Sequence, residues 1–282
     1  SSYSFRPATK LCKGELSVGC KRKCLFCQYS WLNKPFFTHS NSYTSGKNTI
    51  ENFFDELNWE ESKPGKIITA WDGLTEYSRA AVNKPMTDDF IINKLHEIYN
   101  TDPSKNFVVK IYMLAGYPFE KMSYGDPYST IKKILKACDK PIKTHSIKLI
   151  FFTRHFIPMA CTPLAYEGLN WFNFRSLIGT DYLFFNGINI TAYHSIYTSP
   201  PSSACEAMFI QRAVEGDISL INFLFTRNYQ RMNSVEKCVV LKEKMPKRIY
   251  STLDMNSTLP TDFISTPFNF RRAASVYRSK NN

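Results

Sequence analysis

Apolar residues follow two different spacings along the first two thirds of the chain. Stretches rich in apolar residues at 66–70 (KIITA), 107–114 (FVVKIYML) and 146–153 (SIKLIFFT) are typical of buried strands. Between them, residues 87–99, which open on a threonine suited to capping a helix, and residues 128–138 carry apolar side chains at helical intervals. This order predicts an α/β fold in which crossover helices join parallel strands, as an open sheet or as a barrel.

The ends of the expected strands indicate where a ligand would bind. The carboxyl ends of parallel strands lie along one edge of a sheet, and ligands collect at that edge. A further short apolar stretch ends at Val18, just before a cysteine-rich loop. We therefore expect the loops that follow Val18, Ala70, Leu114 and Thr153 to meet and to form the site.

The pattern is looser in the last third of the chain. Residues 181–191 (DYLFFNGINIT) predict one more strand, and residues 204–213 and 217–225 predict helices. No convincing linker interrupts the chain before its tail. We therefore expect a core at residues 1–195, followed by a helical region with a basic tail at residues 196–282.

Composition narrows the class of protein. Of the 282 residues, 43% are hydrophobic, which is ordinary for a globular protein with a substantial core. No apolar run reaches the length of a membrane span, and the first residues (SSYSFRPATK) lack the apolar stretch of a signal peptide. Eight cysteines in a chain of this length indicate a reducing compartment rather than a disulfide scaffold. We therefore expect a cytoplasmic protein without a membrane partner.

The charge of the chain favours a polyanionic partner. Lysine and arginine outnumber the acids by 36 to 24, and the net charge of +12 suits DNA or RNA. Residues 241–282 hold eight basic and three acidic side chains, either as a binding arm or as a solvated tail. The candidate nucleic-acid contacts are Lys21, Arg22, Lys23, Arg271 and Arg272.

Three cysteines stand close together in the stretch GCKRKCLFCQYSW at residues 19–31. Cys20, Cys24 and Cys27 are separated by three and two residues, and thiolates suit zinc or an iron–sulfur cluster. A structural zinc ion takes four ligands, and the nearest fourth thiol, Cys12, comes before an expected strand. Three thiolates suit a four-iron cluster whose remaining iron accepts an exchangeable ligand. Zinc and three unliganded thiols are the alternatives.

CKRKCLFC resembles the CxxxCxxC motif of the radical S-adenosylmethionine (SAM) enzymes. Three further stretches resemble, in the same order, motifs of the cobalamin-associated and methylthiotransferase-like branch of that family. AWDGLTEYSRAAVNKPMT at residues 70–87 is similar to AxEAGTERLRxxINKxxT, KIYMLAGYPFE at residues 110–120 to KLYxMxGLPxE, and FIPMACTPL at residues 156–164 to FxPKxxTPL. The resemblance covers residues 17–167.

The resemblance implies a radical enzyme built on a partial, shortened (β/α) barrel of the TIM type. In that family the three cysteines hold a [4Fe-4S] cluster, and its open iron binds the amino and carboxylate groups of SAM. An electron from a flavodoxin- or ferredoxin-type reductant then cleaves SAM to methionine and a 5′-deoxyadenosyl radical, which abstracts hydrogen from a substrate. The metal ligands implied for this chain are Cys20, Cys24 and Cys27.

The matching residues also define candidate contacts for SAM. Phe26 precedes the last cysteine of the motif, and the resemblance implies that it lies against the adenine. Asp72 and Gly73 follow an expected strand, where a carboxylate and a permissive backbone could hold a ribose hydroxyl or the methionine ammonium; the alternative is a turn with a solvated carboxylate. Glu76 either contacts SAM or pairs with Arg79.

The second long strand supplies another candidate. Alternation puts Lys110 and Tyr112 on one face, and we expect that face to point into a barrel, where Lys110 would be a buried cation near the carboxylate of SAM. On an outward face it would be a surface residue. Gly116 and Pro158 shape the turns after two strands and complete the candidate contacts, and we expect Glu120 to open the next helix.

Several departures from the family pattern limit the resemblance. Nineteen residues precede Cys20, so we expect no cobalamin domain and no cobalamin chemistry. The interval between Cys27 and Ala70 has room for a single helix, which favours a shortened barrel. Met159 stands where the family often has lysine, and the later cysteines lack the spacing of a further cluster.

Three functions are open at this point. The first is a radical enzyme that modifies a nucleic-acid base or a nucleotide, favoured by the charge and by aromatic residues on which bases could stack, although such residues are more often core. The second is the same chemistry on a peptide, a protein side chain or a small metabolite. The third is a non-catalytic module that binds a cluster or zinc. The aromatic residues are Trp31, Phe36, Phe37 and Tyr43.

Overall fold

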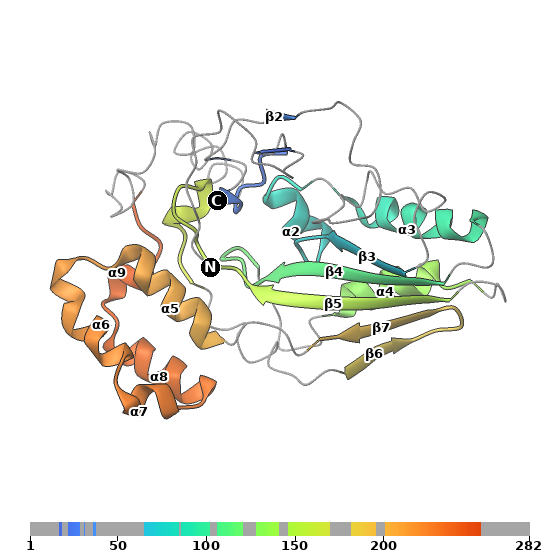
Figure 1. Ribbon diagram of the computed structural model, residues 1–282. Helices are drawn as coiled ribbons and strands as arrows, with labels where there is room; N and C mark the ends of the chain where they lie inside the picture. Colours follow the sequence, from blue (N-terminus) through green and yellow to red (C-terminus); the bar gives the residue numbers. More distant parts are fainter. Residues whose placement is uncertain are drawn as a thin grey trace. The chain divides into compact units, whose positions relative to one another are not determined.

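In the computed structural model of the chain (Figure 1), the described residues are 17–18, 22–28, 31, 36–37, 65–84, 86–101, 106–120, 128–140, 146–169, 182–195 and 201–254. The chain divides into two compact units. The sheet unit comprises Asn41–His155 and Phe172–Thr198, and the helical unit comprises Ser1–Ser40, Phe156–Trp171 and Ser199–Asn282. The division expected after residue 195 stays a prediction.

The sheet unit contains a five-stranded, mostly parallel sheet. Its strand order is β3, β4, β5, β7 and β6; neighbours from β3 to β7 are parallel, and β6 is antiparallel to β7. The predicted α/β class, with parallel strands joined by helices, is therefore confirmed. The strands are β3 (Gly65–Ala70), β4 (Phe107–Ala115), β5 (Ile147–His155), β6 (Tyr182–Asn186) and β7 (Ile190–His194).

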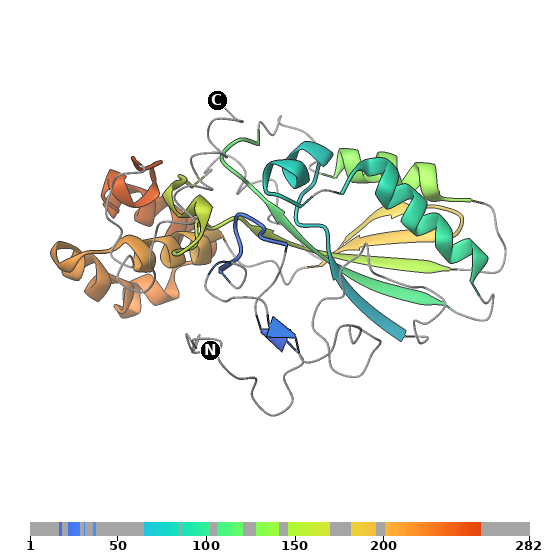
Figure 2. The same cartoon turned by 90° about the horizontal axis from the view of Figure 1, so that it is seen from above.

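Two helices cover one face of this sheet (Figure 2). Helix α3 (Asp88–His96) begins after Thr87, whose side chain accepts a hydrogen bond from the backbone N–H of Phe90, as expected for a capping threonine. Helix α4 (Ser129–Cys138) packs beside α3. A shorter helix, α2 (Glu76–Ala81), precedes α3, and the 3₁₀ turn η2 (Glu97–Asn100) follows it.

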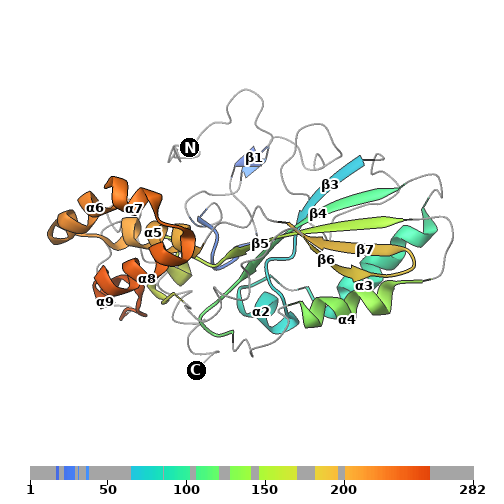
Figure 3. The same ribbon diagram turned by 90° about the horizontal axis from the view of Figure 1, so that it is seen from below.

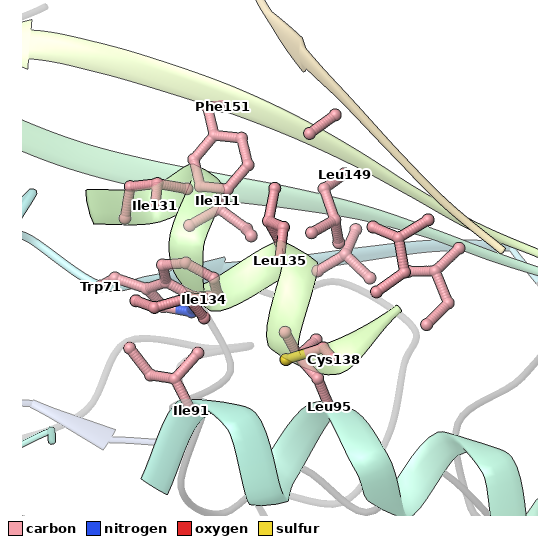
Figure 4. Packing of buried hydrophobic residues seen from close by; sticks show 14 of the residues in the cluster. Trp71, Ile91, Leu95, Ile111, Ile131, Ile134, Leu135, Cys138, Leu149 and Phe151 are labelled. Carbon is pink, nitrogen blue, oxygen red and sulfur yellow. The ribbon is translucent and has the colours of Figure 1, made fainter. Parts of the chain in front are cut away.

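The core of the sheet unit lies between these helices and the sheet (Figure 4). Its side chains come from the apolar positions that the helical spacing and strand alternation select, and their removal from water is the main favourable term in folding. The members labelled in Figure 4 are Trp71, Ile91, Leu95, Ile111, Ile131, Ile134, Leu135, Cys138, Leu149 and Phe151.

Strand β4 separates two faces of the sheet by strict alternation. Its odd-numbered residues, including Val109, Ile111 and Met113, are buried under the helices, whereas Lys110 and Tyr112 are half-buried on the opposite face. This division matches the predicted apolar face of the strand.

The prediction of one strand at residues 181–191 is wrong. The segment forms the antiparallel hairpin of β6 and β7, which turns at Gly187 (Figure 3). The carboxylate of Asp139 stabilises this turn, because it accepts hydrogen bonds from the backbone N–H groups of Ile188 at 2.5 Å, Asn189 at 2.8 Å and Ile190 at 3.0 Å. The Asn–Gly pair was the available sequence signal for a hairpin.

The helical unit contains the helices predicted near residues 204–213 and 217–225. Helix α5 (Pro201–Arg212) packs against α8 (Ser234–Lys244) and α9 (Lys247–Tyr250). Among the described helices, none is both long enough and apolar enough to cross a membrane. The elements are β1 (Ser17–Val18) paired with β2 (Phe36–Phe37), η3 (Pro163–Tyr166), α5 (Pro201–Arg212), η5 (Glu215–Asp217), α6 (Ile218–Leu224), α7 (Arg227–Arg231), α8 (Ser234–Lys244) and α9 (Lys247–Tyr250).

Candidate cluster and cofactor sites

The cysteine loop is a tight turn in the helical unit. The backbone N–H of Cys27 donates to the carbonyl of Cys24 at 3.2 Å, and Lys23 just before this turn has a left-handed φ of 54°. The Cys24 side chain is buried and that of Cys27 is half-buried. The side chain of Phe26, the residue before Cys27, is half-buried. Cys20 and Lys21 lie outside the described residues.

The cysteine loop lies against the segment at residues 156–164, which carries another of the four family-like motifs. The backbone N–H of Leu164 donates to the carbonyl of Leu25 at 3.3 Å. The side-chain amide of Gln28 donates to the carbonyl of Ala160 at 2.7 Å across 132 residues of sequence. The structure therefore brings together two stretches that the sequence singled out separately.

Trp31 fixes the far side of the loop. Its indole N–H donates to the carbonyl of Cys24 at 2.9 Å, and its ring packs against Ala165 and Tyr166. The ammonium group of Lys23 lies 5.3 Å from the centre of the Trp31 ring. The ring thus has a structural role in holding the loop. This role is the alternative to the base stacking for which Trp31 was considered.

The segment at residues 156–164 is itself held by helix α5. The backbone N–H of Ala160 donates to the side chain of Gln211 at 2.5 Å, and the Gln211 amide lies 3.6 Å from the sulfur of Met159. Cys161 is buried with a left-handed φ of 59°, and Pro158 before it is also buried. Met159, the departure from the family lysine, therefore contributes packing rather than charge.

Arg212 is the support that the sequence reasoning missed. This buried side chain on α5 donates to the carbonyls of Ala165 and Glu167 at 2.6 Å each, and to those of Ile249 at 3.0 Å and Ser251 at 2.8 Å. Burial lowers the pKa of the guanidinium to about 10. Because all four acceptors are main-chain oxygens, no side-chain pattern in the sequence could have revealed this role.

Asp72 stands at the carboxyl end of β3 in the sheet unit, as predicted. Its carboxylate forms an ion pair with Lys84, and both side chains are mostly buried. Its backbone has a left-handed φ of 54°, and its carbonyl accepts a hydrogen bond from the hydroxyl of Tyr117 at 2.8 Å. Asp72 is therefore neither a plain turn residue nor a free carboxylate, because its position is fixed from both the side chain and the backbone.

Gly73 is required by close packing. A Cβ atom there would lie 2.9 Å from Cγ of Arg79 and 3.1 Å from Cβ of Ser78. Arg79 is fully buried: it donates to the carbonyls of Met86 at 2.7 Å and Gly73 at 3.3 Å and pairs with Asp88. Burial lowers the pKa of this guanidinium, while the Asp88 carboxylate acts in the opposite direction.

Glu76 is exposed at the start of α2 and has a partner of its own. Its carboxylate accepts a hydrogen bond from the backbone N–H of Asp88 at 2.7 Å, at the start of α3. The ion pair of Arg79 is with Asp88. Glu76 thus contributes to a helix terminus, where a carboxylate is favourable.

Glu120 joins the loops that follow β3 and β4. Its carboxylate accepts hydrogen bonds from the Ser78 hydroxyl at 2.5 Å and from the backbone N–H groups of Gly116 at 2.7 Å and Tyr117 at 3.2 Å. Burial raises the pKa of this carboxyl, and the three hydrogen bonds oppose that shift. The next described helix, α4, begins at Ser129, and residues 121–127 lie outside the described part of the chain, so the expectation that Glu120 opens a helix stays a prediction.

Lys110 lies on the sheet face opposite to α3 and α4. Its ammonium group is 4.8 Å from the centre of the Phe152 ring, and the rings of Tyr112 and Phe152 are 5.5 Å apart. On the same face, the ammonium of Lys148 is 4.7 Å from the centre of the Tyr193 ring. This face therefore combines cations with aromatic rings.

Two of the five candidate nucleic-acid contacts lie within the described residues. Arg22 and Lys23 lie half-buried at the start of the cysteine loop, whereas Arg271 and Arg272, like Lys21, lie outside the described residues. The nucleic-acid contacts proposed for these five residues stay predictions.

The donor set of the cysteine loop suits an iron–sulfur cluster. Two soft thiols, those of Cys24 and Cys27, project from one hydrogen-bonded turn. Within the described part of the chain, no group of three or more His, Cys, Asp or Glu side chains could hold a metal ion. Because Cys20 lies outside that part, the predicted three-thiol set stays a prediction.

Comparison with known proteins adds no relative: no protein-family model, no curated protein and no solved structure matches the chain.

Proposed function

We propose that this chain is a radical SAM enzyme, in which Cys20, Cys24 and Cys27 hold a [4Fe-4S] cluster. The observation that carries the proposal is the packing of the cysteine loop on the segment at residues 156–164, since two family-like motifs far apart in sequence are joined by hydrogen bonds. The parallel neighbours β3, β4 and β5 support it, because a partial barrel of the TIM type has parallel strands in sequential order, whereas the antiparallel hairpin of β6 and β7 departs from that pattern.

The protein contributes positioning and the bound group contributes the redox chemistry. When bound, the reduced cluster supplies the electron that cleaves SAM to methionine and a 5′-deoxyadenosyl radical. Trp31 and Gln28 hold the thiol-bearing turn in place through their hydrogen bonds to the carbonyls of Cys24 and Ala160. Burial of Cys24 keeps water and oxidants from its sulfur.

The resemblance assigns candidate contacts with SAM, and those of each unit are described by themselves. In the helical unit these are Phe26 and Pro158. In the sheet unit, Lys84 and Tyr117 hold Asp72 in place. The free lone pairs of its carboxylate could therefore accept a hydrogen bond from a hydroxyl or ammonium group of SAM without a rearrangement. The other assigned residues of the sheet unit are Gly73, Glu76, Lys110 and Gly116.

For the substrate we favour a nucleic-acid base or a nucleotide. The five described strands contain four Lys or Arg residues and no acidic residue, so they contribute only positive charge to the face that carries Lys110 and Lys148. Tyr112 and Tyr193 supply aromatic surface beside these cations. Phosphates and stacked bases are the ligands that such a combination suits.

A peptide, a protein side chain or a small metabolite is the second candidate substrate. The apolar part of the same face favours it. Ile68 and Ile150 lie in register with Lys110 of β4, and Phe152 lies in register with Tyr112. A neutral substrate that stimulates SAM cleavage, with no measurable polyanion binding, would select this alternative.

The proposed function is tested by the product of SAM cleavage. The full chain is reconstituted anaerobically with iron and sulfide, reduced with dithionite and given SAM, and 5′-deoxyadenosine is measured by liquid chromatography and mass spectrometry. We expect product from the wild type, and none from Cys20→Ala, Cys24→Ala or Cys27→Ala. Cys138→Ala, which removes a core thiol far from the loop in sequence, is the matched control and should retain the product.

Two results would contradict the proposal. A well-formed cluster that never yields 5′-deoxyadenosine would favour a non-catalytic iron–sulfur module. One tightly bound zinc ion per chain, with loss of metal in the same three variants, would favour a structural zinc site.

A further inference from the structure

Helices α5 and α8 lie against each other in a defined register. At their first turns, the hydroxyl oxygens of Ser202 and Ser234 are 3.3 Å apart. One turn further along each helix, this register places Cys205 opposite Cys238. The two helices run in the same direction, since Arg212 at the end of α5 reaches Ile249 just beyond α8.

The two thiols contact each other at this position. Cys205 is fully buried and Cys238 is half-buried, and their sulfurs share a hydrogen bond. This hydrogen bond, followed by burial, raises the pKa of Cys205, whereas the same hydrogen bond lowers the pKa of Cys238. Because Cys205 is fully buried and Cys238 is half-buried, Cys238 is the thiol that a peroxide reaches more readily.

The surroundings hold the pair in place. Tyr229 is fully buried and its hydroxyl donates to the carboxylate of Glu206, the neighbour of Cys205, at 2.7 Å. Lys237, the neighbour of Cys238, has its ammonium group 5.0 Å from the centre of the Tyr229 ring. The first turn of α8 is fixed by Asn233, which accepts from two backbone N–H groups there. Glu206 on α5 and Lys237 on α8 thus contact the same tyrosine beside the thiol pair.

We propose that Cys205 and Cys238 are an oxidative modification site, at which a peroxide converts the thiol pair into a disulfide between α5 and α8. The Cys238 thiolate attacks one oxygen of hydrogen peroxide, the O–O bond breaks, and a sulfenic acid and hydroxide form. The Cys205 sulfur then attacks the sulfenic sulfur, the S–S bond forms, and hydroxide leaves with the Cys205 proton as water. The two thiols lose two electrons and the peroxide gains them.

The disulfide would act on the helix that supports the cysteine loop. Gln211 and Arg212 lie at the end of α5. Gln211 holds Ala160 of the segment on which the loop packs, and Arg212 holds Ala165 and Glu167 just after that segment. Covalent linkage of α5 to α8 closes the chain between residues 205 and 238 and restricts the unfolded state. The proposal does not depend on the proposed radical chemistry.

The test maps disulfides in the full chain. The purified protein is treated anaerobically with a small molar excess of hydrogen peroxide, its free thiols are blocked, and it is digested with trypsin without a reductant. Cleavage after Arg175 and Lys237 gives one peptide at residues 176–212, with Cys205 as its single cysteine, and another at residues 238–242, with Cys238. We expect these two peptides as one cross-linked species that dithiothreitol separates.

Variants and melting temperature complete the design. Cys205→Ser and Cys238→Ser should each abolish the cross-linked species, whereas Cys138→Ser should retain it. Oxidation should raise the melting temperature of the wild type and leave that of Cys238→Ser unchanged. The proposal is overturned if Cys205 and Cys238 are both recovered as blocked thiols after peroxide, if either pairs with another cysteine instead, or if oxidation lowers the melting temperature. Because the wild type is mapped directly, a variant that fails to fold does not compromise the test.

Discussion

His155 stands at the carboxyl end of β5, beside Ala115 at the end of β4. Its side chain is 6% exposed, and burial lowers its pKa from an ordinary 6.5 to about 4. The folded protein therefore holds a neutral imidazole at the edge of the sheet where ligands of parallel sheets bind. The charge state of this residue links the sheet edge to pH.

The stability of the protein should fall as the pH falls from 6.5 toward 4. In that range the unfolded chain binds a proton at His155 that the folded chain does not, so protonation favours unfolding, with about 3 kcal/mol lost by the lower limit. Urea unfolding at several pH values measures this loss. His155→Gln should show a shallower decline than the wild type.

The comparison of wild type and His155→Gln isolates this residue. The raised pKa of Glu120 has the opposite effect, since it favours the folded state as the pH falls, but it is present in both proteins. Parallel stability curves for the two proteins would show that His155 does not contribute the predicted slope.

At the scale of elements, the loops after β3 and β4 form one unit through hydrogen bonds. Ser78 at the start of α2 and the backbone of Gly116 and Tyr117 after β4 all donate to the buried Glu120 carboxylate. The Tyr117 hydroxyl in turn donates a hydrogen bond to the carbonyl of Asp72, after β3. Positions that the sequence assigned to cofactor contacts are therefore also the positions that fix the strand ends.

Ser78 and Glu120 should show energetic coupling. We expect Glu120→Ala to cost about 2–3 kcal/mol of unfolding free energy, because it leaves three donors without their acceptor, and Ser78→Ala about 1 kcal/mol. The double variant should be more stable than additivity predicts, by about 1 kcal/mol, in urea unfolding. Ser78→Ala combined with Thr226→Ala, which removes the cap of α7 in the other unit, is the control pair and should be additive.

The elements themselves could largely be predicted, because their signals are local. The run KIITA and the alternation around Ile111 gave strands, and Thr87 gave the start of α3. The hairpin at Gly187 was missed because apolar residues continue on both sides of a single Asn–Gly pair. What holds that turn, Asp139, lies outside the hairpin in sequence, so only the folded chain reveals it.

At the scale of the whole molecule, the chain has a net charge of +12, and the strands of the sheet contribute to it with basic side chains. Lys66, Lys110, Lys148 and Arg154 are on its strands, and none of the five described strands contains Asp or Glu. A polyanion approaching the face of Lys148 would therefore meet basic side chains on these described strands, which themselves supply no acid.

Binding of single-stranded RNA or DNA should depend strongly on salt. Each phosphate contact releases counterions, so the logarithm of the dissociation constant should rise linearly with the logarithm of salt concentration, and Lys148→Gln should lower this slope by about 0.7. Fluorescence anisotropy with a labelled oligonucleotide measures the slope. Lys133→Gln, an exposed lysine on α4, is the control and should leave it unchanged. Affinity that is indifferent to salt would contradict the nucleic-acid assignment.

Candidate site residues could be selected from the sequence only where residue type and position together indicate a chemical role. The cysteine loop and the residues after β3 were selected as candidates because closely spaced thiols suit a metal or a cluster and a carboxylate at a strand end lies where ligands of parallel sheets bind. Lys84, Tyr117 and Trp31 were not assigned their roles, since each acts on a backbone atom or a side chain that becomes adjacent only through folding.

Arg212 sets a lower limit on how far the chain can be shortened from its C-terminal end. A protein that stopped before Ile249 would keep the cysteine motif intact in sequence, yet it would leave this guanidinium with only two of its four carbonyl acceptors in a buried position. A minimal fragment designed around the motif alone would therefore remove the foundation of the turn that it was meant to preserve.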